Sequence, residues 1–104
     1  MAIDADSGKV ITLTVANKLT LDFRDGSPLE TKAYFVGANK LNNILNQDDC
    51  IGIRIYNGFD IIKQKRNLVL VGVDKNCKDM INGIIVDRLV PCPVDCDATS
   101  SLNS

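Results

Sequence analysis

Several residue types on which enzymes rely are missing or scarce in this sequence. Its 104 residues contain no histidine and no tryptophan, and Glu30 is the one glutamate. Without histidine, the chain cannot build a Ser-His-Asp or Cys-His catalytic group, an imidazole metal ligand or a histidine pH switch. Catalytic chemistry would have to use Asp, Cys, Lys or Tyr. The composition therefore argues against an enzyme and leaves only those residue types open.

A long apolar run and an excess of basic charge are also missing. No apolar stretch approaches the ~20 residues that a membrane-spanning helix needs. Residues 1–6 lack the basic and apolar regions of a secretory signal, so we expect a cytoplasmic protein without a membrane partner. The net charge of −1 does not provide the basic face that is typical of nucleic-acid binding. We therefore expect no specific binding to duplex DNA or RNA.

The residues that are present have the composition of a small globular protein. Hydrophobic residues make up 45% and charged residues 24% of the chain, and the length suits one domain. We expect a single domain over residues 1–104, with polar arms at 1–8 and 97–104. Arms of this kind have no buried role inside one subunit and often lie on a neighbouring subunit.

Two helices are expected. Apolar residues recur at i, i+4, i+8 and i+12 from Ile11 onward, which predicts a helix over residues 12–24. The β-branched residues at 10–15 oppose this assignment, because such side chains lose χ1 freedom in a helix. A second helix is expected over residues 39–47, with Asn39 as its N-cap.

Strand patterns are clearest in the second half of the chain. Residues 50–56 alternate between isoleucine and other residues, and 68–74 are almost continuously apolar, so the two predict an antiparallel hairpin with a long tip. Residues 32–36 are expected to form a further strand. Residues 84–90 suit a strand after the Asn82-Gly83 turn, although a helix is also compatible with their spacing.

The expected fold is α+β, with a small antiparallel sheet of three or four strands and two helices packed on one face. The expected core is Leu19, Phe23, Leu41, Ile44, Leu45, Ile53, Ile55, Val69, Val71 and Ile85.

Three motifs together resemble a known family. They are C-I-G-I-R-I-Y-N-G at 50–58, L-V-L-V-G-V-D at 68–74 and C-P-V-D-C at 92–96. This combination is similar to that of short uncharacterised bacterial proteins with a C-x-G-I-R-x-Y-x-G hairpin and a terminal C-P-x-x-C. The resemblance covers about residues 32–96 and implies a similar architecture but no mechanism, because the family has no established activity. The chain departs from the family at Cys77, where glycine is usual, and in residues 1–25, which do not match it.

The four cysteines allow several arrangements. Cys92 and Cys96 are one residue further apart than a redox or zinc-binding C-x-x-C pair, but they could form a disulfide or a reactive thiol pair. Cys50 and Cys77 should lie at the same end of the hairpin, either reduced and largely buried or bonded to each other. Zinc held by all four thiols is a further alternative, although 27 positions separate Cys50 from Cys77. We expect no cofactor.

A polar binding surface is a second candidate site. Arg54 and Tyr56 share the strand face opposite the isoleucines, and Lys63, Lys65 and Arg66 form the one basic cluster, at the hairpin tip. The cluster could contact phosphate or RNA. No aromatic platform is interleaved with it, so a solvated tip is the favoured interpretation. Arg54 and Tyr56 are either part of a binding surface or ordinary outward-facing residues.

A calcium site in the loop at 74–79 is not supported. The sixth position is Asp79 where an EF-hand needs glycine, and the twelfth is Ile85 where it needs glutamate.

These observations favour a non-catalytic interaction or structural module. Small sheets have unpaired edges that pair readily with another chain, so we expect a homo-oligomer or a subunit of a larger assembly. Its contacts should involve a sheet edge and the C-terminal loop at 92–96. The alternative is a cysteine-based redox or structural metal-site protein that uses the C-P-V-D-C loop.

Overall fold

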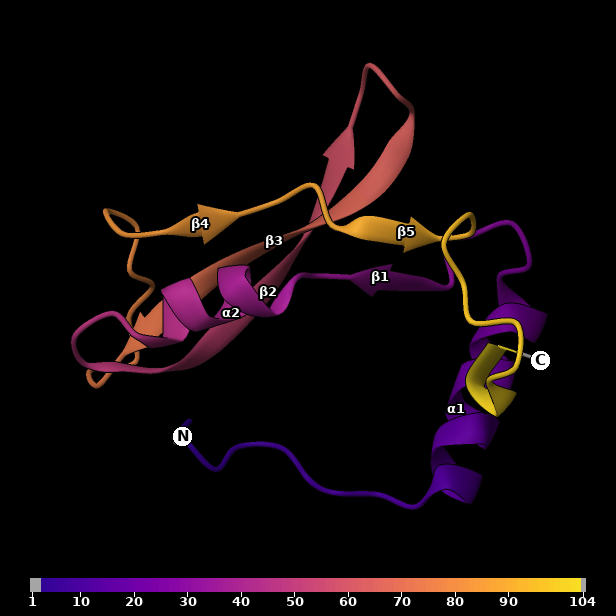
Figure 1. The fold of residues 1–104 in the computed structure, drawn as a ribbon, viewed down its shortest axis with the longest axis horizontal. Coiled ribbons are helices and arrows are strands. Elements are labelled where there is room, and N and C mark those ends of the chain that lie inside the picture. The colour runs from indigo at the N-terminus through magenta and orange to yellow at the C-terminus, as the bar shows by residue number, and fades with distance from the viewer. Residues whose placement is uncertain (1–2, 104) are drawn as a thin grey trace. The chain divides into compact units, whose positions relative to one another are not determined.

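The structure, a computed structural model, describes residues 3–103, which form two compact units (Figure 1). Unit 1 comprises residues 3–7 and 36–89, and unit 2 comprises residues 8–35 and 90–103. The elements include two α-helices and two small antiparallel sheets, so the α+β class expected from the sequence is confirmed. Within residues 3–103, no helix is both long and apolar enough to cross a membrane.

A long antiparallel hairpin forms the frame of unit 1. β2 (Cys50–Asp60) pairs with β3 (Lys65–Asp74) along almost the whole length of both strands. This confirms the predicted hairpin, but the strands extend beyond the predicted bounds. Ladder hydrogen bonds join backbone groups and do not need apolar side chains. The polar residues next to the turn therefore continue the pairing, and only residues 61–64 remain as the tip.

The third strand of this sheet is very short. β4 (Ile85–Val86) pairs with Leu70 and Val71, which gives the strand order β2-β3-β4. Of the strand predicted over 84–90, only these two residues join the hairpin sheet, while Val90 begins a strand of another sheet, and the helical alternative is wrong. Arg88 has a φ of 57°, which lies outside the β region and cannot continue a regular ladder.

Helix α2 (Ala38–Leu45) contacts both β2 and β3. Its Ile44 side chain is completely buried. The helix predicted over 39–47 is present, but Asn39 is not its cap, because the helix begins one residue earlier. Gly37, in extended backbone conformation, stands at the N-cap without a side-chain hydrogen bond.

Gln47 joins the end of α2 to the segment before β4. Its Nε2 donates to the Ile44 carbonyl at 2.9 Å, and its Oε1 accepts from the Ile84 N–H at 2.9 Å. Two glycines leave room for this amide. A Cβ on Gly83 would lie 2.2 Å from Oε1, and a Cβ on Gly72 would lie 3.0 Å from Nε2.

Unit 2 begins with helix α1 (Leu13–Gly26), which confirms the helix predicted over 12–24. Thr12 caps it, since its Oγ1 accepts from the Val15 N–H at 3.2 Å. Ser27 closes the other end by donating its N–H to the Phe23 carbonyl at 2.8 Å. The cap satisfies one backbone donor in the region where β-branched residues weaken the helix.

The other elements of unit 2 show that the expected single sheet is wrong. β1 (Ala33–Phe35) pairs with β5 (Val90–Cys92) in a separate two-stranded sheet and not with the hairpin. Pro91 is tolerated because both strands of such a sheet are edge strands. The last element, η1 (Ser101–Asn103), contacts α1. The two helices therefore belong to different units. In unit 1, α2 contacts the hairpin sheet, whereas α1 belongs to unit 2 and contacts η1.

The buried core differs from the expected one. It consists of Ile44, Leu70, Val71, Val73, Leu89 and Cys92. Ile44 and Val71 were expected there. Five other expected core residues are exposed: Leu19, Phe23, Leu45, Ile55 and Ile85. Leu19 and Phe23 belong to α1, which has no buried residue, so its apolar stripe adds nothing to a core. The other three belong to α2, β2 and β4 and are left uncovered in unit 1.

Candidate functional site

Unit 2 contains an apolar cavity of about 520 Å³, formed by α1, β1 and the C-terminal segment. The helical stripe supplies Leu19 and Phe23, the strand supplies Tyr34 and Phe35, and η1 supplies Leu102. The exposed fraction is 59% for Leu19 and 65% for Phe35. The cavity is therefore open, and its apolar walls are not covered by the chain.

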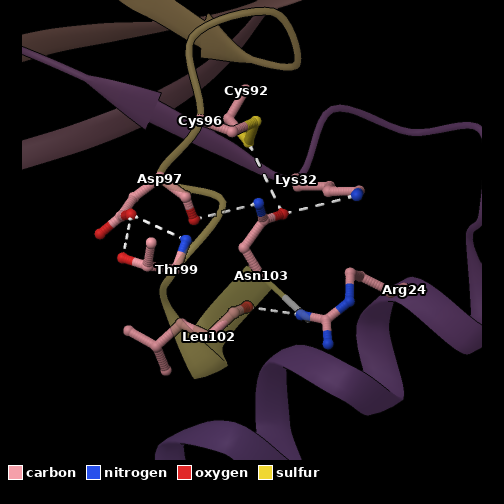
Figure 2. The surroundings of a disulfide bond; sticks show 8 residues. All are labelled: Arg24, Lys32, Cys92, Cys96, Asp97, Thr99, Leu102 and Asn103. Carbon is pink, nitrogen blue, oxygen red and sulfur yellow. Dashed lines mark hydrogen bonds between the residues drawn. A yellow bond between two sulfur atoms is a disulfide. The ribbon is translucent and has the colours of Figure 1, made fainter.

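A disulfide joins Cys92 to Cys96 in the wall of this cavity (Figure 2). Cys92 is buried, with an exposed fraction of 6%, whereas Cys96 is exposed. Strand β5 positions Cys92, and the loop through Pro93 returns the chain so that the two Cα atoms are 5.0 Å apart. The Sγ of Cys92 lies 3.9 Å from Oδ1 of Asn103. The two atoms are neighbours without a hydrogen bond, because a disulfide sulfur carries no proton.

Asn103 holds the C-terminal segment against this wall. Its Oδ1 lies 3.5 Å from the ammonium of Lys32, and its Nδ2 donates to the Asp97 carbonyl at 3.3 Å (Figure 2). Arg24 of α1 donates to the carbonyl of Leu102 (Figure 2). The C-terminal arm therefore has hydrogen-bond partners within its own chain, although residues 97–103 are exposed or half-buried.

Two carboxylates also line the cavity. The carboxylate of Asp97 accepts hydrogen bonds from the hydroxyl and from the backbone N–H of Thr99. Both bonds lower the pKa of this carboxyl, and the bond from the hydroxyl has the larger effect. Asp97 therefore stays charged at neutral pH. The carboxylate of Asp95 has no hydrogen bond or ion pair within residues 3–103. Lys32 and Arg24 line the same cavity, but both are engaged with the C-terminal segment.

The predicted polar surface is divided into two places in unit 1. Arg54 and Tyr56, from the middle of β2, both donate to the carboxylate of Asp79. The hydrogen bond with the Tyr56 side chain raises the pKa of Arg54, and the negative charge of Asp79 raises it further. These two residues thus form a polar cluster with Asp79, a partner that sequence reasoning missed. The one signal for Asp79 in the sequence was that it is an acidic residue in the loop that follows the second strand.

The basic residues lie at the tip. Lys63 belongs to the turn, and Lys65 and Arg66 begin β3. The side chains of Lys63 and Lys65 are exposed and have no partner among the described residues.

The remaining cysteines are free and separate. Cys50 is half-buried and its thiol donates to the Gly52 carbonyl at 3.3 Å. Cys77, expected to be buried, is exposed because it lies in a turn, with a φ of 63°. No Cys50–Cys77 bond is present. Within residues 3–103, no group of three or more Cys, Asp or Glu side chains is placed to hold a metal ion.

Comparison with known proteins identifies no relative of this chain. No family model, no curated protein and no solved structure matches this chain.

Proposed function

We propose that this protein is a small non-catalytic interaction or structural module that works within an assembly. The observation that carries the proposal is the open apolar cavity of unit 2. Cavities of about 300–1,000 Å³ with apolar walls and a few polar groups are typical of binding sites. The titratable side chains on this cavity are Tyr34, two cations and two carboxylates, and they include no nucleophile paired with a base. Binding is thus better supported than catalysis.

The size and composition of unit 2 also support a partner. Its one buried apolar residue is Cys92, while large apolar side chains of α1 and β1 are exposed. Exposed apolar surface that is concentrated in one place commonly marks an interaction site.

We expect the protein to work in the cytoplasm. A Cys92–Cys96 disulfide that persists in cells would instead indicate an oxidising compartment. The resemblance to short bacterial C-P-x-x-C proteins stays a prediction.

Analytical ultracentrifugation tests the proposal. At tens of micromolar, we expect a species heavier than the 11.3 kDa chain, either alone or with protein co-purified from the native source. A protein that is monomeric throughout this range, and that retains no partner, would contradict the proposal.

Thiol–disulfide exchange is a second candidate, favoured by the position of the disulfide in the cavity wall. A thiolate of a dithiol substrate would attack Sγ of the exposed Cys96. The sulfur–sulfur bond would break, and Cys92 would leave as a thiolate and take up a proton. The second thiol of the substrate would then displace Cys96, so that two electrons and two protons pass to the protein and the substrate becomes a disulfide.

The two single-cysteine variants test this candidate. Cys96 is exposed and Cys92 is buried. In a Cys50→Ser, Cys77→Ser background, which removes the two free thiols, the reduced Cys92→Ser protein keeps only Cys96. It should therefore form a mixed disulfide with oxidised glutathione faster than the Cys96→Ser protein, which keeps only Cys92. Intact mass against time gives both rates. Equal rates, or no reaction of either variant, would exclude exchange at this site.

A further inference from the structure

The tip of the β2–β3 hairpin is an ordered turn that presents apolar side chains to solvent. Ile61 is 75% exposed and Ile62 is 95% exposed. The turn is nevertheless held by its own hydrogen bonds. Asp60 Oδ1 accepts from the N–H groups of Ile62 at 3.0 Å and of Lys63 at 3.1 Å. Gln64 Nε2 donates to the Ile61 carbonyl at 2.7 Å. The two isoleucines are therefore pre-organised, which lowers the entropic penalty of binding.

The tip also projects beyond the third strand of its sheet. β4 pairs only with Leu70 and Val71, so the half of β3 nearest the tip has β2 as its single neighbour. In Figure 1 this end of the hairpin is the loop that joins β2 to β3. A narrow, two-stranded projection with an apolar end is suited to enter a cavity in another molecule.

We infer that the Ile61–Ile62 tip of one copy inserts into the unit 2 cavity of a second copy. This inference rests on the proposed function and identifies the partner as the same chain. The large apolar residues of the cavity walls match the aliphatic tip in polarity; they are Leu19, Phe23, Tyr34, Phe35 and Leu102. A cavity of about 520 Å³ has room for a small ligand, and two aliphatic side chains need no more space.

Charge complementarity supports the same pairing. Lys63 lies in the tip and Lys65 follows it, and their ammonium groups have no partner within residues 3–103. The carboxylate of Asp95, on the cavity, likewise has no partner among these residues. Arg24 and Lys32 on the same cavity keep their positive charge, because their acceptors, the Leu102 carbonyl and Asn103, are neutral, but the carboxylates of Asp95 and Asp97 balance them. Opposite charges at the rim of a contact chiefly set orientation and association rate. We therefore assign affinity to the isoleucines and orientation to the lysines.

A mixing experiment with two blocked variants tests the inference. Ile62→Asp alters the tip and leaves the cavity intact. Leu19→Lys alters the cavity, keeps a good helix former on α1 and repels the basic tip. Both positions are exposed, so both variants should fold. We expect the wild type to associate at tens of micromolar and each variant alone to be monomeric. An equimolar mixture should contain a species of twice the chain mass, because one intact tip meets one intact cavity.

Two further variants complete the design. Ile81→Asp is the matched control, because Ile81 is 70% exposed elsewhere in unit 1 and should associate like the wild type. Asp95→Asn should raise the dissociation constant by about two- to fivefold at low salt, since one exposed charge contributes little.

Several outcomes would overturn the inference. Association that persists in Ile62→Asp would exclude the tip and leave the proposed function standing on another surface. A variant mixture that remains monomeric would mean that both residues belong to a different contact. A wild type that is monomeric but bound to a co-purified protein would exclude self-association and keep the proposed function. A wild type that is monomeric and without any partner would exclude both.

Discussion

Unit 1 and unit 2 are stabilised in different ways. Five of the six buried apolar residues belong to unit 1, where α2 covers a three-stranded sheet. Unit 2 has Cys92 alone. Its two segments are joined by a short β ladder and by hydrogen bonds from side chains to the C-terminal residues, and a disulfide closes a loop within the second segment. Burial of apolar side chains is the main source of folding stability. We infer that unit 1 is the stable frame and that unit 2 is the part available for binding.

The largest expected effect separates the two units directly. Ile44→Ala removes a completely buried side chain and should lower the free energy of unfolding by about 2–5 kcal/mol. Leu19→Ala in unit 2 should cost less than about 1 kcal/mol, because Leu19 is 59% exposed. Urea unfolding followed by circular dichroism measures both. Leu45→Ala is the control within α2, since Leu45 is 44% exposed. Similar losses for Ile44 and Leu19 would show that the comparison is wrong.

Loss of the disulfide should have an intermediate effect, confined to unit 2. The closed loop spans four positions, and the chain-entropy model gives about 2 kcal/mol for so short a loop. After reduction, amide hydrogen exchange should accelerate in residues 90–103 and remain unchanged in 68–74. Faster exchange throughout the hairpin would indicate that the two units unfold together.

A smaller effect is expected where α2 meets the segment before β4. In Gly83→Ala, the new Cβ would lie 2.2 Å from Oε1 of Gln47, so the amide must move and lose its bond to the Ile84 N–H. The expected loss is about 1 kcal/mol, the typical contribution of one hydrogen bond. Gly52→Ala is the matched control, because no atom lies within 4 Å of its Cβ position. Equal stability of both variants would argue against the role of Gln47.

The smallest effect is a pH dependence of the C-terminal segment. The folded pKa of Asp97 is lowered from its ordinary value of 3.8, chiefly by the Thr99 hydroxyl. The stabilisation is therefore present above that value and disappears as the pH falls through the folded pKa. An NMR titration of the Asp97 carboxyl should have its midpoint below 3.8, and Thr99→Ala should raise it. An unchanged midpoint in Thr99→Ala would contradict the assigned cause.

Sequence reasoning succeeded where the pattern is local. The alternating isoleucines of β2 and the apolar run of β3 identified the hairpin, and the spacing from Ile11 identified α1. It was wrong about the partner of the first strand and about which apolar side chains are buried. Residues 33–35 have a strand pattern, but nothing in them indicates that the partner is residues 90–92. The stripe of α1 predicts an apolar face, but not that the face lines an open cavity.

The candidate site could be predicted only in its parts. Cys92 and Cys96 are close in sequence, so their pairing is a local possibility that spacing can suggest. The cavity was missed because its walls combine α1 and β1 with the C-terminal segment, which is distant from both along the chain. Asp79 was likewise considered for calcium and not as the partner of Arg54, which lies 25 positions earlier.

The sequence by itself determined what depends on neighbouring residues: the helix spans, the hairpin, the exclusion of histidine chemistry and the basic tip. These follow from backbone propensity, side-chain period and composition, each of which acts over a few residues. Only the tertiary structure decided the division into two units, the pairing of β1 with β5, and the cavity beside the disulfide. Those features depend on contacts between distant residues, and many partners are compatible with the same local pattern.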